Sequence, residues 1–173
     1  KGYNLLMSED VLAAIDSIKK MGIKVKLHKS YCEIFGNGIN GFKYKKNLIL
    51  DSKNSGTLGR LILGLLIKSP KKIKIIGDKS LSKRDFSRVT IPLEKFGAKF
   101  YYKTKGKLPL SIQGSPSIKG IKYLENKGSA QCKSSVMFAA LNSSGTTSIK
   151  AKKSRDHTEL LFKYLKIPIK IKK

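Results

Sequence analysis

The sequence contains no tryptophan, only two cysteines and few acidic residues. Among its 173 residues, 11 Asp and Glu face 37 Lys and Arg, which gives a formal net charge of +26. Cys32 and Cys132 match no metal-ligand or redox spacing, so we expect two buried thiols in a reducing compartment, the cytoplasm, with no metal and no cofactor. The longest apolar run, residues 61–67, is too short to span a bilayer, and residues 1–10 do not form a signal peptide, so we expect no membrane partner.

Arginine is also scarce, because only four of the 37 basic residues are arginine. Nucleic-acid-binding proteins usually combine arginine forks with stacking aromatic residues, whereas here lysines are spread over every segment. The composition therefore favours anionic small-molecule substrates, which a positive field also concentrates, and argues against nucleic acid. The alternative is a basic nucleic-acid-binding module built on similar α/β repeats. Such a module would bind RNA or DNA with an affinity that depends on the salt concentration. A stand-alone scaffold protein is supported by no feature of the sequence.

Helical and strand-like patterns alternate along the chain. Residues 8–22 predict a helix, because Ser8 is a good N-cap, Val11 and Ile15 recur at helical spacing, and Gly22 ends the pattern. Further helices are expected over residues 54–66, 82–98, 129–141 and 157–166. Strands are expected over residues 23–28, 31–38, 47–52, 71–78, 99–104, 108–114, 117–125 and 146–151.

These elements form an internal repeat. Residues 14–28 and 92–104 both end a helix with glycine and continue into a lysine-containing strand, and residues 157–172 do the same with Lys166 in the glycine's place. The unit is strand–helix–strand–helix–strand–strand, with copies at about 1–50, 51–113 and 114–173. The first copy lacks its opening strand and helix, and the last stops after its second helix. The sequence therefore predicts an α/β architecture of repeated βαβαββ units.

Polar clusters stand where strands are followed by helices, and all four arginines lie in them. The clusters are residues 51–60, 77–88, 126–135 and 152–159, and the arginines are Arg60, Arg84, Arg88 and Arg155. Helix N-termini carry free N–H groups and a positive dipole end, so such starts can hold anions. Arginine binds carboxylate or phosphate at two points. Each cluster by itself is better explained as an ordinary capped helix. We interpret Arg60, inside its helix, as part of an interior ion pair or as a strut for the turn at residues 54–57, and His157 as a further ligand candidate.

Four motifs resemble, in order and spacing, those of the 5-enolpyruvylshikimate-3-phosphate (EPSP) synthase family, the 3-phosphoshikimate 1-carboxyvinyltransferases. They are NSGTLGRLILGLL at 54–66, GDKSLSKRDFSRVTIPLEKFGA at 77–98, GSAQCKSSVMFAAL at 128–141 and SRDHTELL at 154–161. The spellings SAQ.KS and SRDHTE resemble the glyphosate-tolerant class. The resemblance implies two lobes, each of three strand–helix repeats around a pseudo-threefold axis, with substrates bound in the cleft between them.

The resemblance also implies an activity and a set of binding residues. The activity is transfer of the enolpyruvyl group from phosphoenolpyruvate to the 5-hydroxyl of shikimate 3-phosphate, in aromatic amino-acid (chorismate) biosynthesis. Contacts with phosphoenolpyruvate are implied for Gly56, Arg84 and Gln131. Contacts with shikimate 3-phosphate are implied for Ser129, Ala130, Gln131, Ser154 and Arg155. Supporting roles are implied for Asn54, Thr57 and Arg60.

The chain departs from the family pattern in two respects. Asp85 stands where the family usually has proline, next to Arg84, and this carboxylate either caps the helix or weakens anion binding. The family's N-terminal GDKS motif does not precede Lys1, and the second lobe, with the catalytic Asp and Glu, is missing. We therefore expect one incomplete lobe with no catalytic residues, inactive alone and partnered by the second lobe of the same enzyme.

Overall fold

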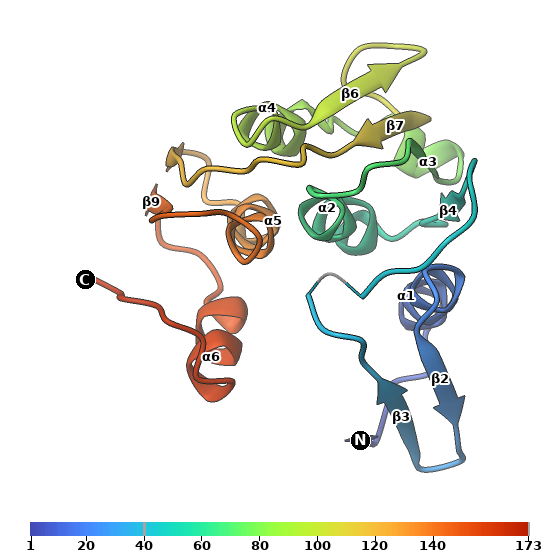
Figure 1. Ribbon diagram of the computed structural model, residues 1–173. Helices are drawn as coiled ribbons and strands as arrows, with labels where there is room; N and C mark the ends of the chain where they lie inside the picture. The colour runs from blue at the N-terminus through green and yellow to red at the C-terminus, as the bar shows by residue number, and fades with distance from the viewer. Residues whose placement is uncertain (40, 173) are drawn as a thin grey trace.

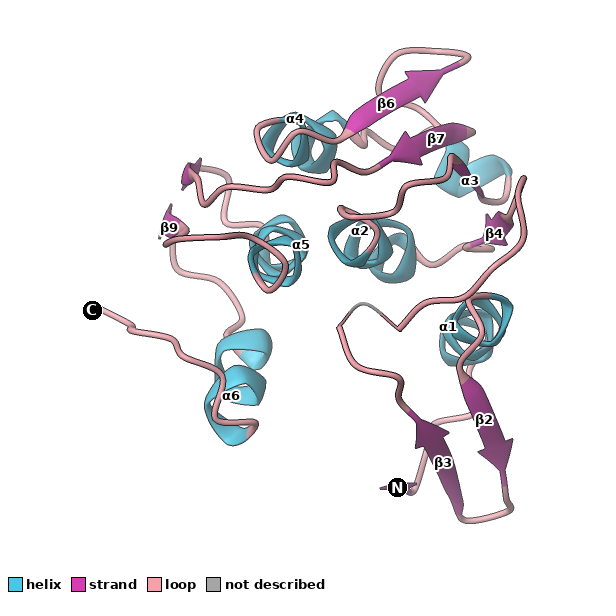
Figure 2. Ribbon diagram, viewed as in Figure 1, coloured by secondary structure: helices cyan, strands magenta, loops and turns pink. Residues whose placement is uncertain are grey.

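Short strands and helices alternate throughout the computed structural model, which describes residues 1–39 and 41–172. In chain order they are β1 (Gly2–Tyr3), α1 (Glu9–Lys20), β2 (Lys24–Leu27), β3 (Tyr31–Phe35), β4 (Ile49–Asp51), α2 (Gly56–Leu65), β5 (Ile73–Ile76), α3 (Lys79–Ser82), α4 (Ser87–Glu94), β6 (Lys99–Tyr102), β7 (Leu110–Gln113), β8 (Lys122–Glu125), α5 (Ala130–Ala140), β9 (Ser148–Ala151) and α6 (His157–Tyr164). Helices α2 and α5 lie side by side at the centre, and the strands lie around them (Figures 1 and 2). The fold is mixed α/β, as predicted.

The three sheets share one strand arrangement, which is complete in the four-stranded sheet and partial in the other two. The four-stranded sheet has the order β4-β5-β7-β6, in which β4 and β5 are parallel and the other neighbours are antiparallel. The three-stranded sheet β1-β3-β2 is antiparallel and repeats the β5-β7-β6 part. The parallel pair β8-β9 repeats the β4-β5 part. The repeat seen in the sequence is therefore present in the strand order, with the short strand β1 as an element that the sequence analysis did not include.

The helix ends follow the repeat down to the backbone angles. After α1, Gly22 has φ 85°, and the N–H groups of Gly22 and Ile23 donate back to carbonyls of the last turn. After α6, Lys166 has φ 56°, and Lys166 and Ile167 make the same two bonds. This pair of bonds is the Schellman motif, which needs a left-handed residue after the helix. Gly97 after α4 also has a left-handed backbone, with φ 97°. Lys166 thus adopts the conformation that glycine adopts in the other copies.

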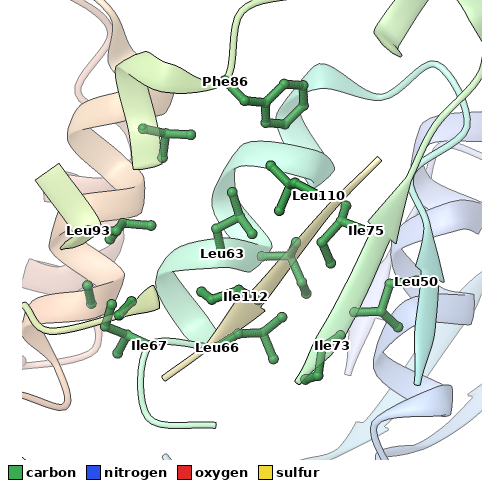
Figure 3. Packing of buried hydrophobic residues seen from close by; sticks show 14 of the residues in the cluster. Leu50, Leu63, Leu66, Ile67, Ile73, Ile75, Phe86, Leu93, Leu110 and Ile112 are labelled. Carbon is green, nitrogen blue, oxygen red and sulfur yellow. The ribbon is translucent and has the colours of Figure 1, made fainter. Parts of the chain in front are cut away.

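The main core lies between α2 and the four-stranded sheet. Leu63 in α2 and Ile67 just after it belong to one buried cluster with Ile75 and Ile112 of the sheet (Figure 3). All four side chains are fully buried. Each contributes about 1.5–3 kcal/mol through burial, so this packing fixes α2, and with it the loop that precedes α2.

Glycine allows α2 and α5 to approach each other closely. A methyl group at Gly64 would lie 2.1 Å from the carbonyl oxygen of Ser135 on α5. The Ser135 hydroxyl donates to the carbonyl of Arg60 at 2.9 Å. Because the two helices are held at this short distance, their N-terminal ends present their side chains to the same region.

The structure corrects the prediction of one helix over residues 82–98. Two helices, α3 and α4, are separated by residues 83–86. The carboxylate of Asp85 accepts the backbone N–H of Ser87 at 2.8 Å and its hydroxyl at 2.6 Å, and such side-chain bonds to the backbone compete with helix continuation. Asp85 therefore lies one residue before the N-cap of α4, Phe86, and bonds to the first residue of the helix without occupying the cap position.

A second difference concerns the C-terminal end, where residues 167–172 form no strand. A strand needs a neighbour to accept its backbone hydrogen bonds, and within the described residues this segment has none.

Cys32 and Cys132 are both buried and unpaired, as predicted. None of the helices in the described ranges has the length and apolar character needed to cross a membrane.

Candidate functional site

The loop between β4 and α2 forms the first part of the site. Ser55 caps α2, because its hydroxyl accepts the N–H of Leu58 at 3.2 Å. Gly56 is the first residue of α2 and is buried. A methyl group at Gly56 would lie 3.0 Å from Nη1 of Arg60 and 3.1 Å from Nη1 of Arg84. Two guanidinium groups thus converge on the start of α2, where the positive end of the helix dipole also lies.

These two guanidinium groups have little negative charge beside them. Burial lowers the pKa of Arg60, and the positive charges of Arg84 and Arg88 lower it further. Within residues 1–39 and 41–172, neither Arg60 nor Arg84 forms a salt bridge. The Asp85 carboxylate, next to Arg84 in sequence, is bonded to Ser87 instead. An anion between the two arginines would therefore be attracted by both.

Arg60 connects α2 to α5 through a chain of hydrogen bonds. Its Nη1 donates to Oε1 of Gln131 at 2.8 Å, and Nε2 of Gln131 donates to Oγ1 of Thr57 at 2.8 Å. Its Nη2 donates to the carbonyl of Asp85 at 3.3 Å, and its guanidinium carbon lies 5.2 Å from the centroid of the Phe86 ring. Arg60 is therefore a strut between α2, α5 and the start of α4. The alternative of an interior ion pair is wrong for the described part of the chain.

A cavity of about 160 Å³ lies beside Gln131. Its lining consists of Thr57, Leu61, Ala130, Gln131, Ser134, Arg155, His157 and Thr158. Gln131 thus faces the same cavity as Arg155 and is also bonded to Arg60, which meets Arg84 at Gly56. A larger cavity of about 260 Å³ is lined by apolar side chains such as Phe42 and Leu65, and none of the predicted residues lines it.

Several predicted residues lie near this cavity without lining it. Asn54 donates to the Asp78 carboxylate at 2.6 Å, and Asp78 caps α3, which leads to Arg84. The hydroxyl of Ser154 is buried and has no hydrogen-bond partner among the described residues. The predicted residues outside the lining are Asn54, Gly56, Arg60, Arg84, Ser129 and Ser154. The structure therefore arranges the predicted residues as a cation pair at Gly56 and a cavity at Arg155, joined by Gln131.

A buried carboxylate that the sequence analysis missed lies at the end of β8, beside the start of α5. Ser129 caps α5 by accepting the N–H of Cys132 at 3.3 Å. The Glu125 carboxylate accepts the N–H groups of Ser129 at 2.8 Å and Lys127 at 3.3 Å, and Nη2 of Arg88 lies 3.8 Å from it. Glu125 is only 3% exposed. Arg88 is therefore paired with a carboxylate of the protein, although its own side chain is 36% exposed. An acidic residue at the end of a strand and before a polar turn is the only sequence signal that could have indicated this.

A second buried ion pair was also missed, between Lys133 of α5 and Glu159 of α6. Lys133 additionally donates to the carbonyl of Arg155 at 3.1 Å. The sequence analysis placed Lys133 in the motif SAQ.KS, but in a chain with so many lysines it gave no sign of the partner Glu159. No three His, Cys, Asp or Glu side chains in the described ranges are grouped closely enough to hold a metal ion.

The order of these features along the chain agrees with one family of proteins. A model of that family, "EPSP synthase (3-phosphoshikimate 1-carboxyvinyltransferase)", matches residues 2–173. The chain belongs to the EPSP synthase family. The 3-phosphoshikimate 1-carboxyvinyltransferase of Bacillus subtilis is 44% identical over 158 residues, which are 90% of this chain and 36% of that enzyme. The enzyme of the same name from Streptococcus mutans is 41% identical over 165 residues, 94% of this chain and 38% of the relative.

Solved structures of EPSP synthase share the fold. The 2.37 Å structure of EPSP synthase from Acinetobacter baumannii matches with a TM-score of 0.91 and 34% sequence identity, over 97% of this chain and 38% of that chain. The present chain therefore spans somewhat more than a third of the length of the family members that it matches.

Proposed function

We propose that this chain is the substrate-binding part of one lobe of an EPSP synthase, and that the whole enzyme transfers the enolpyruvyl group from phosphoenolpyruvate to the 5-hydroxyl of shikimate 3-phosphate. The main support is the position of Gln131, which is bonded to Arg60 beside Arg84 and also lines the cavity of Arg155. Two cationic positions on either side of one amide suit two anionic substrates that must react with each other.

The residues divide between the two substrates according to this geometry. Gly56, Arg84 and Gln131 hold phosphoenolpyruvate, because the two arginines that meet at Gly56 form no salt bridge with any described residue. Ser129, Ala130, Gln131, Ser154 and Arg155 hold shikimate 3-phosphate, with its phosphate near Arg155. Asn54, Thr57 and Arg60 support this arrangement through the hydrogen bonds described above.

The reaction needs these cations and also a proton donor and acceptor. The 5-hydroxyl oxygen attacks C2 of phosphoenolpyruvate and gives up its proton to the general base, while the methylene carbon C3 gains a proton from the general acid. The C2–O bond to phosphate then breaks, C3 loses a proton, and inorganic phosphate leaves. Arginines that hold the carboxylate and phosphate groups lower the repulsion between two anions in the transition state. The general acid and base are supplied by the other lobe, so the present chain is inactive alone.

The strand arrangement supports the division into one complete and two partial repeat units, at about 1–50, 51–113 and 114–173. A full lobe has three copies of the β4-β5-β7-β6 arrangement around a pseudo-threefold axis. Large apolar side chains are exposed on α6 and on β3, among them Leu160, Tyr164 and Phe35. Exposed apolar surface of this kind marks a contact with further protein, and we assign it to the remaining elements of the same lobe.

The proposal is tested with a chimera of the Bacillus subtilis enzyme. The matching segment of that enzyme is replaced by this chain, and phosphate release is measured with phosphoenolpyruvate and shikimate 3-phosphate. We expect turnover by the chimera and none by this chain alone. An inactive but folded chimera would contradict the substrate roles, and turnover by the 173 residues alone would contradict the assignment to half of a site.

A matched pair of variants separates the anion site from general charge. Arg84→Gln in the chimera should lower kcat/KM by about 10²–10³, the usual effect of removing one group that stabilises the transition state. Lys83→Gln removes the same charge at the neighbouring exposed position and should have little effect. Equal losses for both variants would show that only net charge matters.

Shikimate 3-phosphate should bind this chain alone at millimolar concentrations or not at all, as measured by calorimetry.

We propose further that the enzyme is of the glyphosate-tolerant class and acts in the cytoplasm, in the shikimate pathway. The motifs SAQ.KS at 129–134 and SRDHTE at 154–159 support the first point, and the two buried free thiols support the second. Glyphosate competes with phosphoenolpyruvate in the family. Inhibition of the complete enzyme by glyphosate at concentrations below the KM for phosphoenolpyruvate would contradict assignment to the tolerant class.

A further inference from the structure

The two motifs that point to the tolerant class touch each other through their charged residues. Lys133 is the lysine of SAQ.KS, and Glu159 is the glutamate of SRDHTE. They form a salt bridge between α5 and α6, in which the side chains are 9% and 13% exposed. A pair of charges buried to this degree is costly to desolvate, so it is weak evidence for stability by itself. Its position suggests another purpose.

Lys133 also holds the backbone of the segment that carries Arg155. Its Nζ donates to the carbonyl of Arg155 at 3.1 Å. Among the described residues this is the contact that links α5 directly to Arg155, while the Arg155 side chain lines the cavity beside Gln131. One ammonium group therefore joins Glu159, in the first turn of α6, to the residue that faces the cavity.

The attachment of α6 to α5 does not depend on this ion pair. The hydroxyls of Ser134 and Thr158 are 2.6 Å apart and form a buried hydrogen bond. The rings of Phe138 and Phe162 pack with their centroids 6.1 Å apart. Loss of the Lys133 charge should therefore leave α6 in place and release mainly the segment at residues 154–156.

We infer that Lys133 and Glu159 are positioning residues that hold the 154–156 segment against α5, so that Arg155 faces the phosphate of shikimate 3-phosphate. The inference rests on the proposed function for the identity of the ligand. The attachment of the segment itself is independent of any ligand. The inference also implies that Lys133 and Glu159 act together, so that neither residue alone holds the segment against α5.

The first experiment measures the attachment without ligand. Amide hydrogen exchange at Leu160, whose N–H donates to the Asp156 carbonyl at 3.0 Å, is compared in this chain for Lys133→Met and for Lys153→Met, an exposed neighbour that loses the same charge. Because release of residues 154–156 breaks this bond, we expect exchange at Leu160 to rise at least about tenfold for Lys133→Met and to stay unchanged for Lys153→Met. Equal exchange in the two variants overturns the inference. If Lys133→Met does not fold, Glu159→Gln, which keeps the side-chain shape, takes its place.

The second experiment measures the consequence for substrate in the chimera described above. Lys133→Met should raise the KM for shikimate 3-phosphate on the order of tenfold and leave the KM for phosphoenolpyruvate unchanged. Lys133→Arg keeps both the charge and a donor and should restore the lower KM. The double exchange of Lys133→Glu with Glu159→Lys should restore stability only, because a glutamate cannot donate to the carbonyl of Arg155.

The outcomes separate this inference from the proposed function. A chimera without activity, together with faster exchange in Lys133→Met, removes the proposed function and supports the attachment. An active chimera in which Lys133→Met and Lys153→Met have the same KM for shikimate 3-phosphate overturns the positioning role. A double exchange that restores the low KM also overturns it, because the ion pair alone would then be sufficient.

Discussion

Gly64→Ala is expected to destabilise the protein by forcing α2 and α5 apart. The added methyl group would lie 2.1 Å from the Ser135 carbonyl oxygen, and contacts below 3.0 Å essentially do not occur. The two backbones must therefore separate by roughly 1 Å, with loss of dispersion contacts along both helices. Overpacking of this kind costs about 1–3 kcal/mol, and the higher helix propensity of alanine returns at most about 1 kcal/mol. The net expectation is a loss of about 1–2 kcal/mol.

Gly56→Ala, in the same helix, provides the matched comparison. Its methyl group would press on the tips of two flexible arginine side chains, at 3.0 and 3.1 Å, and make an ordinary contact with Leu81 at 3.7 Å. We expect the free energy of unfolding to change by less than about 0.5 kcal/mol. Because Arg60 and Arg84 must move aside, however, the anion site is disturbed. In the chimera the KM for phosphoenolpyruvate should rise by about 10–100-fold, which corresponds to the loss of one hydrogen bond to a charged group.

Urea unfolding and thermal unfolding, both followed by circular dichroism, measure the first effect for both variants. The Tm should fall by about 2–8 °C for Gly64→Ala, since 1 kcal/mol shifts the Tm by about 2–4 °C in a domain of this size. A stable Gly64→Ala protein would show that the close approach of α2 and α5 is not needed. A destabilised Gly56→Ala protein, with unchanged phosphoenolpyruvate binding, would refute the assignment of the two glycines to different tasks.

Three further predictions concern the core, the strut and Asp85. Leu63→Ala should cost about 2–5 kcal/mol because its side chain is fully buried, whereas Leu160→Ala at an exposed position should cost under about 0.5 kcal/mol in the same urea titration. Arg60→Lys keeps the charge but not the fork of donors, so the chimera should lose about tenfold or more in kcat/KM with its net charge unchanged. Hydrogen bonds from Ser87 hold the pKa of Asp85 below its ordinary value of 3.8. The carboxylate's stabilising effect is therefore complete above about pH 4 and is lost as the pH falls further. The difference in unfolding free energy between wild type and Asp85→Asn should be constant at about pH 5–7 and shrink below about pH 4. A difference that does not depend on pH would contradict this.

The sequence by itself determined the order of elements, because local signals decide them. Ser8, Ser55 and Ser129 cap helices where the polar starts predicted caps. Gly22 and Gly97 end helices with positive φ. The repeat was readable for the same reason, since each copy ends a helix with a residue of positive φ. The family resemblance also rested on local motifs, and the match over residues 2–173 confirmed it.

Only the tertiary structure decided which of these residues meet. The sequence placed Arg60 inside a predicted helix. Its hydrogen-bond partner Gln131, however, is 71 residues away and lies on another helix. The break between α3 and α4 depended on Asp85. Whether its carboxylate bonds to Ser87 or faces Arg84 could not be predicted from the neighbouring residues. A single lysine among many became buried because Glu159 lies opposite it on α6. Helix propensity and caps act within a few residues, whereas the value of a charge depends on burial and on partners brought from far along the chain, and these exist only once the helices have packed.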